Sequence, residues 1–181
     1  MKISVYIATS LDGFIAREDR DIEWLNNSGY GEVDKGEDFG YEAFMSTVDA
    51  LVMGRKTYEK VLSFGGDWPY GKNPVFVLST SGVKIPDAIS ETVSSLSGST
   101  QKIVKQLEKL GYQHIYLDGG LTIQKFLEAG LVDEITITKI PVFIGKGIPL
   151  FGPLSKDIKL KHVQTEAFNN GFVQSRYEIF K

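Results

Sequence analysis

The stretch DALVMGRKTYE, residues 49–59, joins an apolar strand to a helix through one glycine. The apolar run ends at Gly54, and two cations and Thr57 follow. The first turn of a helix leaves backbone N–H groups without partners and carries partial positive charge. Arg55 adds a planar fork of donors suited to phosphate, and Thr57 can donate a further hydrogen bond. The stretch therefore predicts an anion site at the carboxyl end of a buried strand.

The stretch YLDGGLTIQKFL, residues 116–127, repeats this arrangement further along the chain. A strand ends at Asp118, two glycines follow, and a helix starts near Thr122. In open α/β sheets, ligands bind beyond the carboxyl ends of the strands, so the two turns could flank one diphosphate. Neither turn is the GxGxxG fingerprint, which argues against a standard Rossmann site. Plain turn geometry and a solvated Arg-Lys pair are the alternative interpretation of either motif alone.

A third strand end, VFVLSTS at residues 75–81, leaves Ser79, Thr80 and Ser81 beyond four apolar residues. Together with Arg55, these hydroxyl groups could hold a ribose phosphate, and an arginine in that role favours NADP over NAD. An ordinary Ser/Thr loop is the alternative.

Apolar periodicity and turn residues predict the remaining elements. Strands are expected at residues 3–8, 50–53, 75–78, 114–117 and 135–140, and the last of these should have one buried face. Helices are expected at residues 41–47, 57–62 and 121–129. A further helix is expected from Thr100, with an apolar stripe formed by Ile103, Val104, Leu107 and Leu110. Residues 26–40 are predicted to form a surface loop, and Asn170-Gly171 predicts a hairpin. The order predicts a single α/β domain, residues 1–181, with a mixed, mostly parallel sheet and a C-terminal antiparallel hairpin.

Composition narrows the classes of function. The net charge is −3, which disfavours general binding to nucleic acid or membrane surfaces. The chain has no cysteine and only two histidines, His114 and His162, which lack ligand spacing, so no metal site is expected. No segment approaches the ~18 apolar residues of a membrane span, and a cytoplasmic protein is expected.

These stretches, in this order, resemble the dihydrofolate reductase superfamily, and most closely the C-terminal reductase domain of the bifunctional riboflavin-biosynthesis deaminase/reductase. The resemblance is carried by SLDGFIA (10–16), VMGRKTYE (52–59), PYGKNPVFVLST (69–80) and LDGGLTIQKFLEAGLVDEITITKIPVFIGKGIPLF (117–151). It implies a dihydrofolate reductase-like fold, NADPH as cofactor, hydride transfer to a small-molecule substrate, and a homodimer. The zinc-binding deaminase half is absent, so a stand-alone reductase domain is expected.

The resemblance also implies a cofactor site. Its residues are Gly54, Arg55, Lys56 and Thr57 at the first diphosphate turn, Leu78, Ser79 and Thr80 on the adenosine side, Gly119, Gly120, Leu121 and Thr122 at the second diphosphate turn, and Ala8 and Ile15 at the nicotinamide carboxamide. Arg55 is expected on the 2′-phosphate. Trp24 resembles the tryptophan of the mobile active-site loop, with a core aromatic as the alternative.

The proton donor is left open by the sequence. The acids before the VMGR strand are Asp34, Glu37, Asp38 and Glu42. Counting back without gaps points to Asp38, and gaps would move the match to Glu42; a solvated acid is the alternative for each. Thr138 matches a pterin-contacting threonine, and Lys139 and Lys146 are candidate contacts to a phosphorylated substrate.

Three functions are compatible with these motifs and with the resemblance. The first is an NADPH-dependent reductase of the riboflavin type, acting on a ribosylamino-pyrimidine or similar heterocycle. The second is a dihydrofolate reductase or a related carbonyl or imine reductase. The third is an NADP-binding domain without turnover.

Overall fold

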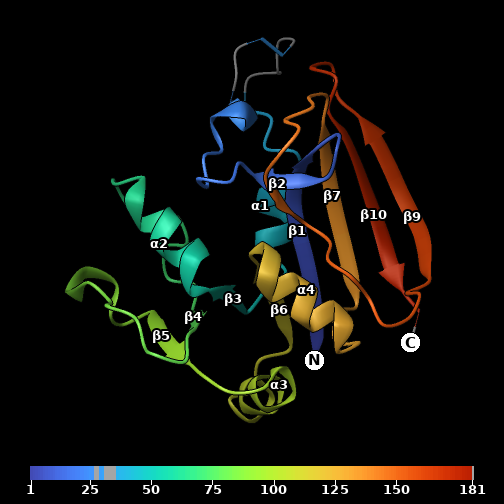
Figure 1. The fold of residues 1–181 in the computed structure, drawn as a ribbon. Coiled ribbons are helices and arrows are strands. Elements are labelled where there is room, and N and C mark those ends of the chain that lie inside the picture. Colours follow the sequence, from blue (N-terminus) through green and yellow to red (C-terminus); the bar gives the residue numbers. More distant parts are fainter. Residues whose placement is uncertain (27–28, 31–35, 181) are drawn as a thin grey trace.

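A computed structural model describes residues 1–26, 29–30 and 36–180, and its centre is an eight-stranded sheet with the order β5-β4-β3-β6-β1-β7-β10-β9 (Figure 1). The strands are β1 (Lys2–Ser10), β3 (Ala50–Gly54), β4 (Val75–Leu78), β5 (Val93–Leu96), β6 (His114–Asp118), β7 (Glu134–Ile140), β9 (Leu160–Ala167) and β10 (Val173–Ile179). The strands from β5 to β7 pair in parallel, and the hairpin of β9 and β10 closes one edge antiparallel to β7. This is the mixed sheet predicted from the sequence.

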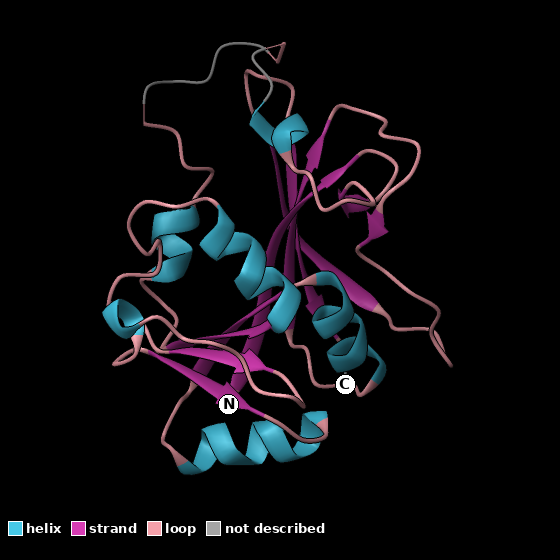
Figure 2. Ribbon diagram, turned by 60° about the vertical axis from the view of Figure 1, so that its left-hand side comes forward, coloured by secondary structure: helices cyan, strands magenta, loops and turns pink. Residues whose placement is uncertain are grey.

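Helices cover both faces of the parallel part of the sheet (Figure 2). They are α1 (Tyr41–Met45), α2 (Arg55–Ser63), α3 (Thr100–Lys109) and α4 (Gly120–Glu128), and short 3-10 turns lie at Glu23–Asn26 and Asp87–Ile89. A separate two-stranded sheet joins β2 (Phe14–Ala16) to β8 (Ile148–Pro149). In the described part of the chain, no helix is both long and apolar enough to cross a membrane.

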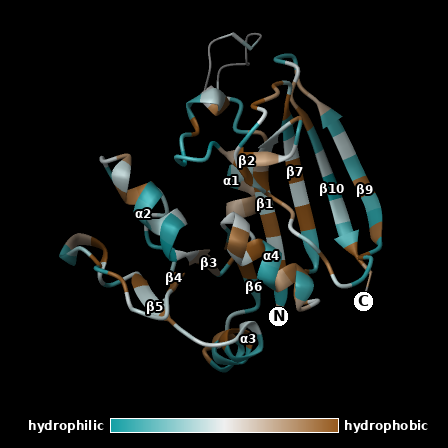
Figure 3. Cartoon of the chain, in the orientation of Figure 1, coloured by the Kyte–Doolittle hydropathy of each residue, from teal (hydrophilic) through white to brown (hydrophobic). Residues whose placement is uncertain are grey.

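The core has one cluster on each face because side chains alternate along each strand. Ile115 and Leu117 of β6 pack with α3 and α4, whereas Tyr116 packs with the residues of α1 and α2. Brown, hydrophobic strands therefore lie in the middle of the sheet, and teal positions are frequent on β9 and β10 (Figure 3). Burial of this apolar surface on both faces is the main stabilising term for the parallel strands.

The structure corrects the predicted elements at four places. Residues 135–140 do form a strand, but β7 is buried on both faces rather than one, because it lies between β1 and β10 under helix α4. Helix α2 begins at Arg55, two residues earlier than predicted. Leu110 is 63% exposed and lies beyond the last turn of α3, outside the apolar stripe. Strand β5 was not predicted, because two exposed serines hide its apolar pattern. Much of the loop predicted at 26–40 lies outside the described residues.

Candidate active site

The two glycine turns lie side by side at the carboxyl edge of the sheet. Strands β3 and β6 are neighbours, and their parallel register pairs Met53 with Asp118, so Gly54 and Gly119 follow at the same level. Helix α2 starts directly after the first turn and helix α4 after the second. The unpaired N–H groups of two helices therefore meet in one place, as binding of one diphosphate requires.

A side chain at Gly54 or Gly119 would fill the space between the turns, and one at Gly120 would meet Ile15. A Cβ on Gly54 would lie 2.8 Å from Thr122 Oγ1, and one on Gly119 would collide with the Thr57 hydroxyl. Gly119 also has a φ of 94°, which favours glycine. A Cβ on Gly120 would lie 2.8 Å from Ile15 Cδ1. The glycines thus allow close packing of the turns and expose backbone that an anion can approach, which fits a dinucleotide diphosphate.

The third strand end adjoins the first turn as expected. The register pairs Gly54 with Leu78, and Arg55 Nη1 lies 3.5 Å from Ser81 Oγ. The Nε atom of Arg55 also lies 3.6 Å from the Glu59 carboxylate, an exposed pair that contributes little to stability. The Arg55 guanidinium is therefore held over the serine loop, next to the glycine turn.

The remaining predicted cofactor residues fall around the same edge. The side chains of Lys56, Thr80 and Leu121 are exposed. The Ser79 hydroxyl donates a hydrogen bond of 2.8 Å to the Gly82 carbonyl. Ala8 lies on β1 and packs in a partly buried cluster with Trp24. Trp24 is 4% exposed and packs on Ile140 and Phe172 as a core aromatic.

In the SLDG segment, Asp12 holds two loops together through hydrogen bonds. The Asp12 carboxylate accepts hydrogen bonds from the Ser10 hydroxyl at 2.6 Å and the Gly145 N–H at 2.8 Å. A third bond of 3.3 Å comes from the Ile144 N–H. Slight burial raises the pKa of Asp12, but these hydrogen bonds outweigh it and lower the pKa below its ordinary value. Asp12 thus ties the turn after β1 to the loop after β7.

Asp118 is a site residue that the sequence motifs did not single out. It ends β6, directly before the second glycine turn, and its Oδ1 accepts a hydrogen bond of 2.7 Å from the Gly119 N–H. Burial raises its pKa to about 6, and the Gly119 N–H only partly offsets this effect. Burial raises the pKa values of Tyr41, Tyr70 and Tyr116, and the charge of Asp118 raises them further. The signal in the sequence was an acid placed directly before a glycine pair.

A family comparison fits this geometry. The family model described as the RibD C-terminal domain matches residues 1–174. The chain belongs to the RibD C-terminal domain family. A putative riboflavin biosynthesis protein from Shewanella sp. PV-4 is 39% identical, each chain is covered over 100% of its length, and the TM-score is 0.92.

Two more distant structures show the fold. The deaminase/reductase of Thermotoga maritima is 19% identical, with a TM-score of 0.74, and the match covers 99% of this chain and 56% of that one. A dihydrofolate reductase from Enterococcus faecalis, complexed with NADP(H), is 16% identical, with a TM-score of 0.65 and coverage of 99% and 97%. The chain therefore has the dihydrofolate reductase-like fold expected from its sequence.

In this RibD C-terminal domain, Asp38 caps a helix. Its carboxylate accepts from the Glu42 N–H at 2.6 Å and from the Gly40 N–H at 2.9 Å, and both bonds lower its pKa. A lowered pKa is the opposite of what a proton donor needs near neutral pH. Glu42 is exposed on α1, and Asp34 lies outside the described residues.

Thr138 belongs to a polar network on the α1 face of the sheet. Gln174 Nε2 donates to Thr138 Oγ1 at 3.0 Å, to the Tyr6 hydroxyl at 2.9 Å and to the Phe39 carbonyl at 3.0 Å. The Tyr6 hydroxyl in turn donates to the same carbonyl. The network connects β1, β7 and β10 to the segment that leads into α1.

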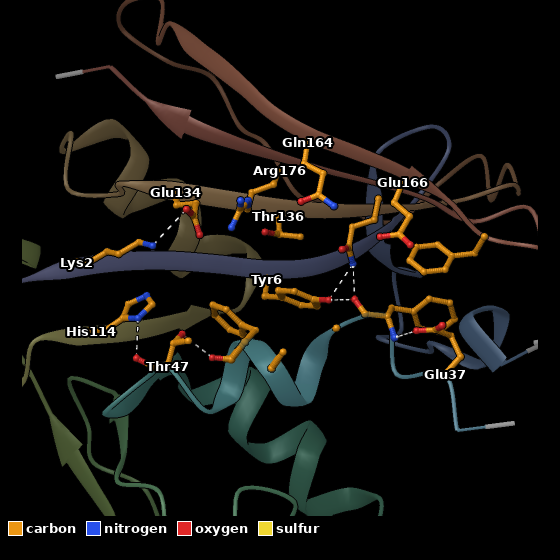
Figure 4. A pocket seen from close by; sticks show the side chains of 16 residues that line it. Lys2, Tyr6, Glu37, Thr47, His114, Glu134, Thr136, Gln164, Glu166 and Arg176 are labelled. Carbon is orange, nitrogen blue, oxygen red and sulfur yellow. Dashed lines mark hydrogen bonds and ion pairs between the residues drawn. The ribbon is translucent and has the colours of Figure 1, made fainter. Parts of the chain in front are cut away.

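A polar pocket of about 570 Å³ lies beside this network, with Tyr6 in its wall (Figure 4), and the turn residues Gly54, Gly119 and Gly120 do not line it. Its wall includes Lys2, Tyr6, His114, Glu134, Glu166 and Arg176. It opens along the amino-terminal half of the strands, where Lys2 pairs with Glu134 at 3.2 Å. The backbone donors suited to a diphosphate lie at the turns and not in this pocket, so the turns are the better candidate for a cofactor site.

The two lysines predicted to contact a substrate phosphate lie on different surfaces of the protein. Lys139 follows Thr138 on β7, so strand alternation turns it to the opposite face. Lys146 lines a different pocket with Arg17 and Gly145.

Proposed function

We propose that this protein is an NADPH-dependent reductase of a small heterocycle, of the riboflavin-biosynthesis type. The observation that carries the proposal is the packing of two glycine turns, one before α2 and one before α4, at the carboxyl ends of adjacent parallel strands. Membership of the RibD C-terminal domain family supports it. The proposed substrate class is a ribosylamino-pyrimidine.

The residues present fit a bound NADPH. The backbone N–H groups after Gly54 and Gly119 would hold the diphosphate, with Thr57 and Thr122 as further donors at the same turns. Arg55, beside Ser81, would hold the 2′-phosphate. The bound cofactor would supply a hydride, and the protein would supply position and electrostatics.

Asp118 is the best candidate for the acid of the reaction. It is buried enough to have a pKa of about 6, near the pH at which a general acid is effective. Asp38 and Glu42 are weaker candidates, because one caps a helix and the other is exposed. Thr138 would have an indirect role, because its hydroxyl accepts a hydrogen bond from Gln174, which also donates to Tyr6.

A dihydrofolate reductase-type activity is the second candidate, and the fold shared with the Enterococcus faecalis enzyme favours it. A domain that binds NADP without turnover is the third. Measuring NADPH consumption with dihydrofolate and with the ribosylamino-pyrimidine separates the first two functions. Binding of NADPH without consumption on either would favour the third.

The cofactor assignment is tested by Arg55→Ala. We expect NADPH to bind about tenfold more weakly while NADH affinity stays the same, because only NADPH has the 2′-phosphate that Arg55 would pair with. Nicotinamide fluorescence during titration with each cofactor measures both affinities.

Glu59→Gln is the matched control, since it removes the ion-pair partner of Arg55 and keeps the cation. The control should keep the preference for NADPH. Equal binding of both cofactors by the parent protein would refute the role of Arg55.

A further inference from the structure

Side chains from alternate positions of three strands share one wall of the polar pocket. They are Lys2 and Tyr6 of β1, Glu134 and Thr136 of β7, and Gln174 and Arg176 of β10. Alternate residues of a strand point to the same face, so the fold turns all of them toward helix α1. With a volume of about 570 Å³, the space between this wall and α1 has the size of a small-molecule site.

Arg176 stands between two neutral donors in this wall. The sheet register places it opposite Thr136 of β7 on one side and Gln164 of β9 on the other. All three residues line the pocket, and they lie side by side in Figure 4. A planar guanidinium flanked by a hydroxyl and an amide offers several donors at one place, which suits bidentate binding of a phosphate.

The charge of Arg176 is not offset by a partner. Among the described residues, none forms an ion pair or a side-chain hydrogen bond with its guanidinium. The other cation of the wall, Lys2, pairs with Glu134 at 3.2 Å. His114 donates from Nδ1 to the Thr47 carbonyl at 2.9 Å, and burial lowers its pKa, so it adds little positive charge near neutral pH. In the described structure, Arg176 is therefore the uncompensated cation of the pocket.

The unpaired acids lie toward the other end of the pocket. Glu166 stands opposite Gln174, two residues nearer the carboxyl edge of the sheet than Arg176. Glu37 belongs to the segment before α1, where its carboxylate accepts a hydrogen bond of 2.6 Å from the Phe39 N–H. Carboxylates accept hydrogen bonds from amino and ring N–H groups, and they repel a phosphate. The pocket is thus polarised, with its anion-binding group on the amino-terminal side.

Aromatic rings line the acidic end and connect it to the expected cofactor position. Phe39 and Phe168 both line the pocket, and their rings meet edge to face with centroids 4.9 Å apart. They pack in one apolar cluster with Ala8, where the family resemblance places the nicotinamide. A heterocycle bound against these rings would therefore adjoin the hydride donor.

The spacing along the strands suits a phosphorylated sugar. Ala8 is in register with Thr138 of β7. Arg176 is in register with Thr136, two residues nearer the amino-terminal end of β7. The two levels are therefore about 7 Å apart along the sheet. A five-carbon sugar phosphate spans a comparable length, so a reacting carbon near Ala8 would leave the phosphate near Arg176.

We infer that this pocket binds the substrate of the proposed reductase, and that Arg176 selects a phosphorylated substrate by binding its phosphate between Thr136 and Gln164. The inference rests on the proposed function, because it takes the hydride from a cofactor held at the glycine turns. The heterocycle would lie against the aromatic end, with its amino and N–H groups toward Glu166. Arg176 would supply the cation for the phosphate, since neither lysine predicted for that role lines this pocket.

The test compares a ribosylamino-pyrimidine 5′-phosphate with its nucleoside. Calorimetric titration into protein saturated with NADP⁺ gives both dissociation constants without turnover. We expect the phosphate to bind at least about tenfold more tightly, because the guanidinium–phosphate pair adds affinity. Arg176→Gln should reduce this ratio to less than about threefold by weakening binding of the phosphate alone. Arg176→Lys should keep part of the ratio, because it retains the charge and loses the planar fork.

Arg17→Gln is the matched control, since Arg17 is an exposed arginine in the separate pocket with Lys146. It should leave the ratio unchanged, and a ratio lost in this variant would overturn the inference, because the phosphate would then lie in that pocket. Equal binding of the two compounds by the parent, binding of neither, a ratio that survives Arg176→Gln, or equal weakening of both compounds in that variant would also overturn it.

Oxidation of NADPH by the phosphate compound, followed by absorbance, tests the proposed function separately. Oxidation together with a ratio that survives Arg176→Gln would refute the inference and leave the proposed function standing. A parent protein that does not bind NADPH would refute both.

Discussion

At the scale of single residues, the carboxyl group of Asp118 costs stability. Its pKa rises from the ordinary 3.8 to about 6 because burial disfavours the charge. Between these two values the folded chain holds a proton that the unfolded chain has released, so stability falls as the pH rises through this window. The difference corresponds to at most about 3 kcal/mol at neutral pH. A buried carboxyl group with a raised pKa is typical of a functional group.

Asp118→Asn should therefore stabilise the protein at neutral pH. The gain, relative to the parent, should be about 1–3 kcal/mol larger at about pH 7.5 than at about pH 4.5, because only the parent ionises between them. Urea unfolding of both proteins at both pH values measures it. A gain that is the same at the two pH values would contradict the raised pKa of Asp118.

At the scale of elements, the two strand-to-helix turns pack directly against each other. Gly54 and Thr122 face across one contact, and Gly119 and Thr57 face across the other. The sequence predicted both turns, because a glycine after an apolar run and before a helix is a local signal. It could not show that each turn packs against the threonine of the other, because β3 and β6 are distant in sequence and adjacent only in the sheet.

This packing predicts a rescue. Gly54→Ala should weaken NADPH binding and destabilise the fold by about 1–3 kcal/mol, because its Cβ would lie 2.8 Å from Thr122 Oγ1. Adding Thr122→Ala should restore most of the stability, since it removes the obstructing hydroxyl. Thermal unfolding and cofactor titration of the single and double variants measure both effects.

Gly119→Ala with Thr57→Ala serves as the comparison. It should recover less, because the φ of 94° at Gly119 strains any side chain there. Equal recovery in both double variants would show that backbone conformation is unimportant at the second turn.

At the scale of the whole molecule, the C-terminal hairpin of β9 and β10 is exposed to solvent at the edge of the sheet. Strand β9 is the edge of the sheet, and nearly all its residues are exposed, whereas the parallel strands are buried. An exposed edge strand presents unpaired backbone groups on which a second chain can assemble. A homodimer through this hairpin, as the family resemblance implies, stays a prediction.

Sedimentation velocity over a range of concentrations tests the dimer. We expect twice the mass of 20.1 kDa for the parent. Glu166→Lys, at an exposed position of β9, should shift the population toward monomer by changing the charge on the hairpin face. Lys84→Glu, far from the hairpin in sequence and exposed, is the control. A monomeric parent at every concentration would exclude the dimer.

The sequence by itself determined the order of elements, the α/β class, the glycine turns and the C-terminal hairpin, because apolar periodicity and turn chemistry act within a few residues. Only the tertiary structure decided that β7 is covered on both faces, and that Gly54 and Gly119 pack against Thr122 and Thr57. It alone raised the pKa of Asp118, because desolvation depends on how the fold buries the carboxyl group. Burial and charge at the site are sums over distant parts of the chain, which a local pattern does not contain.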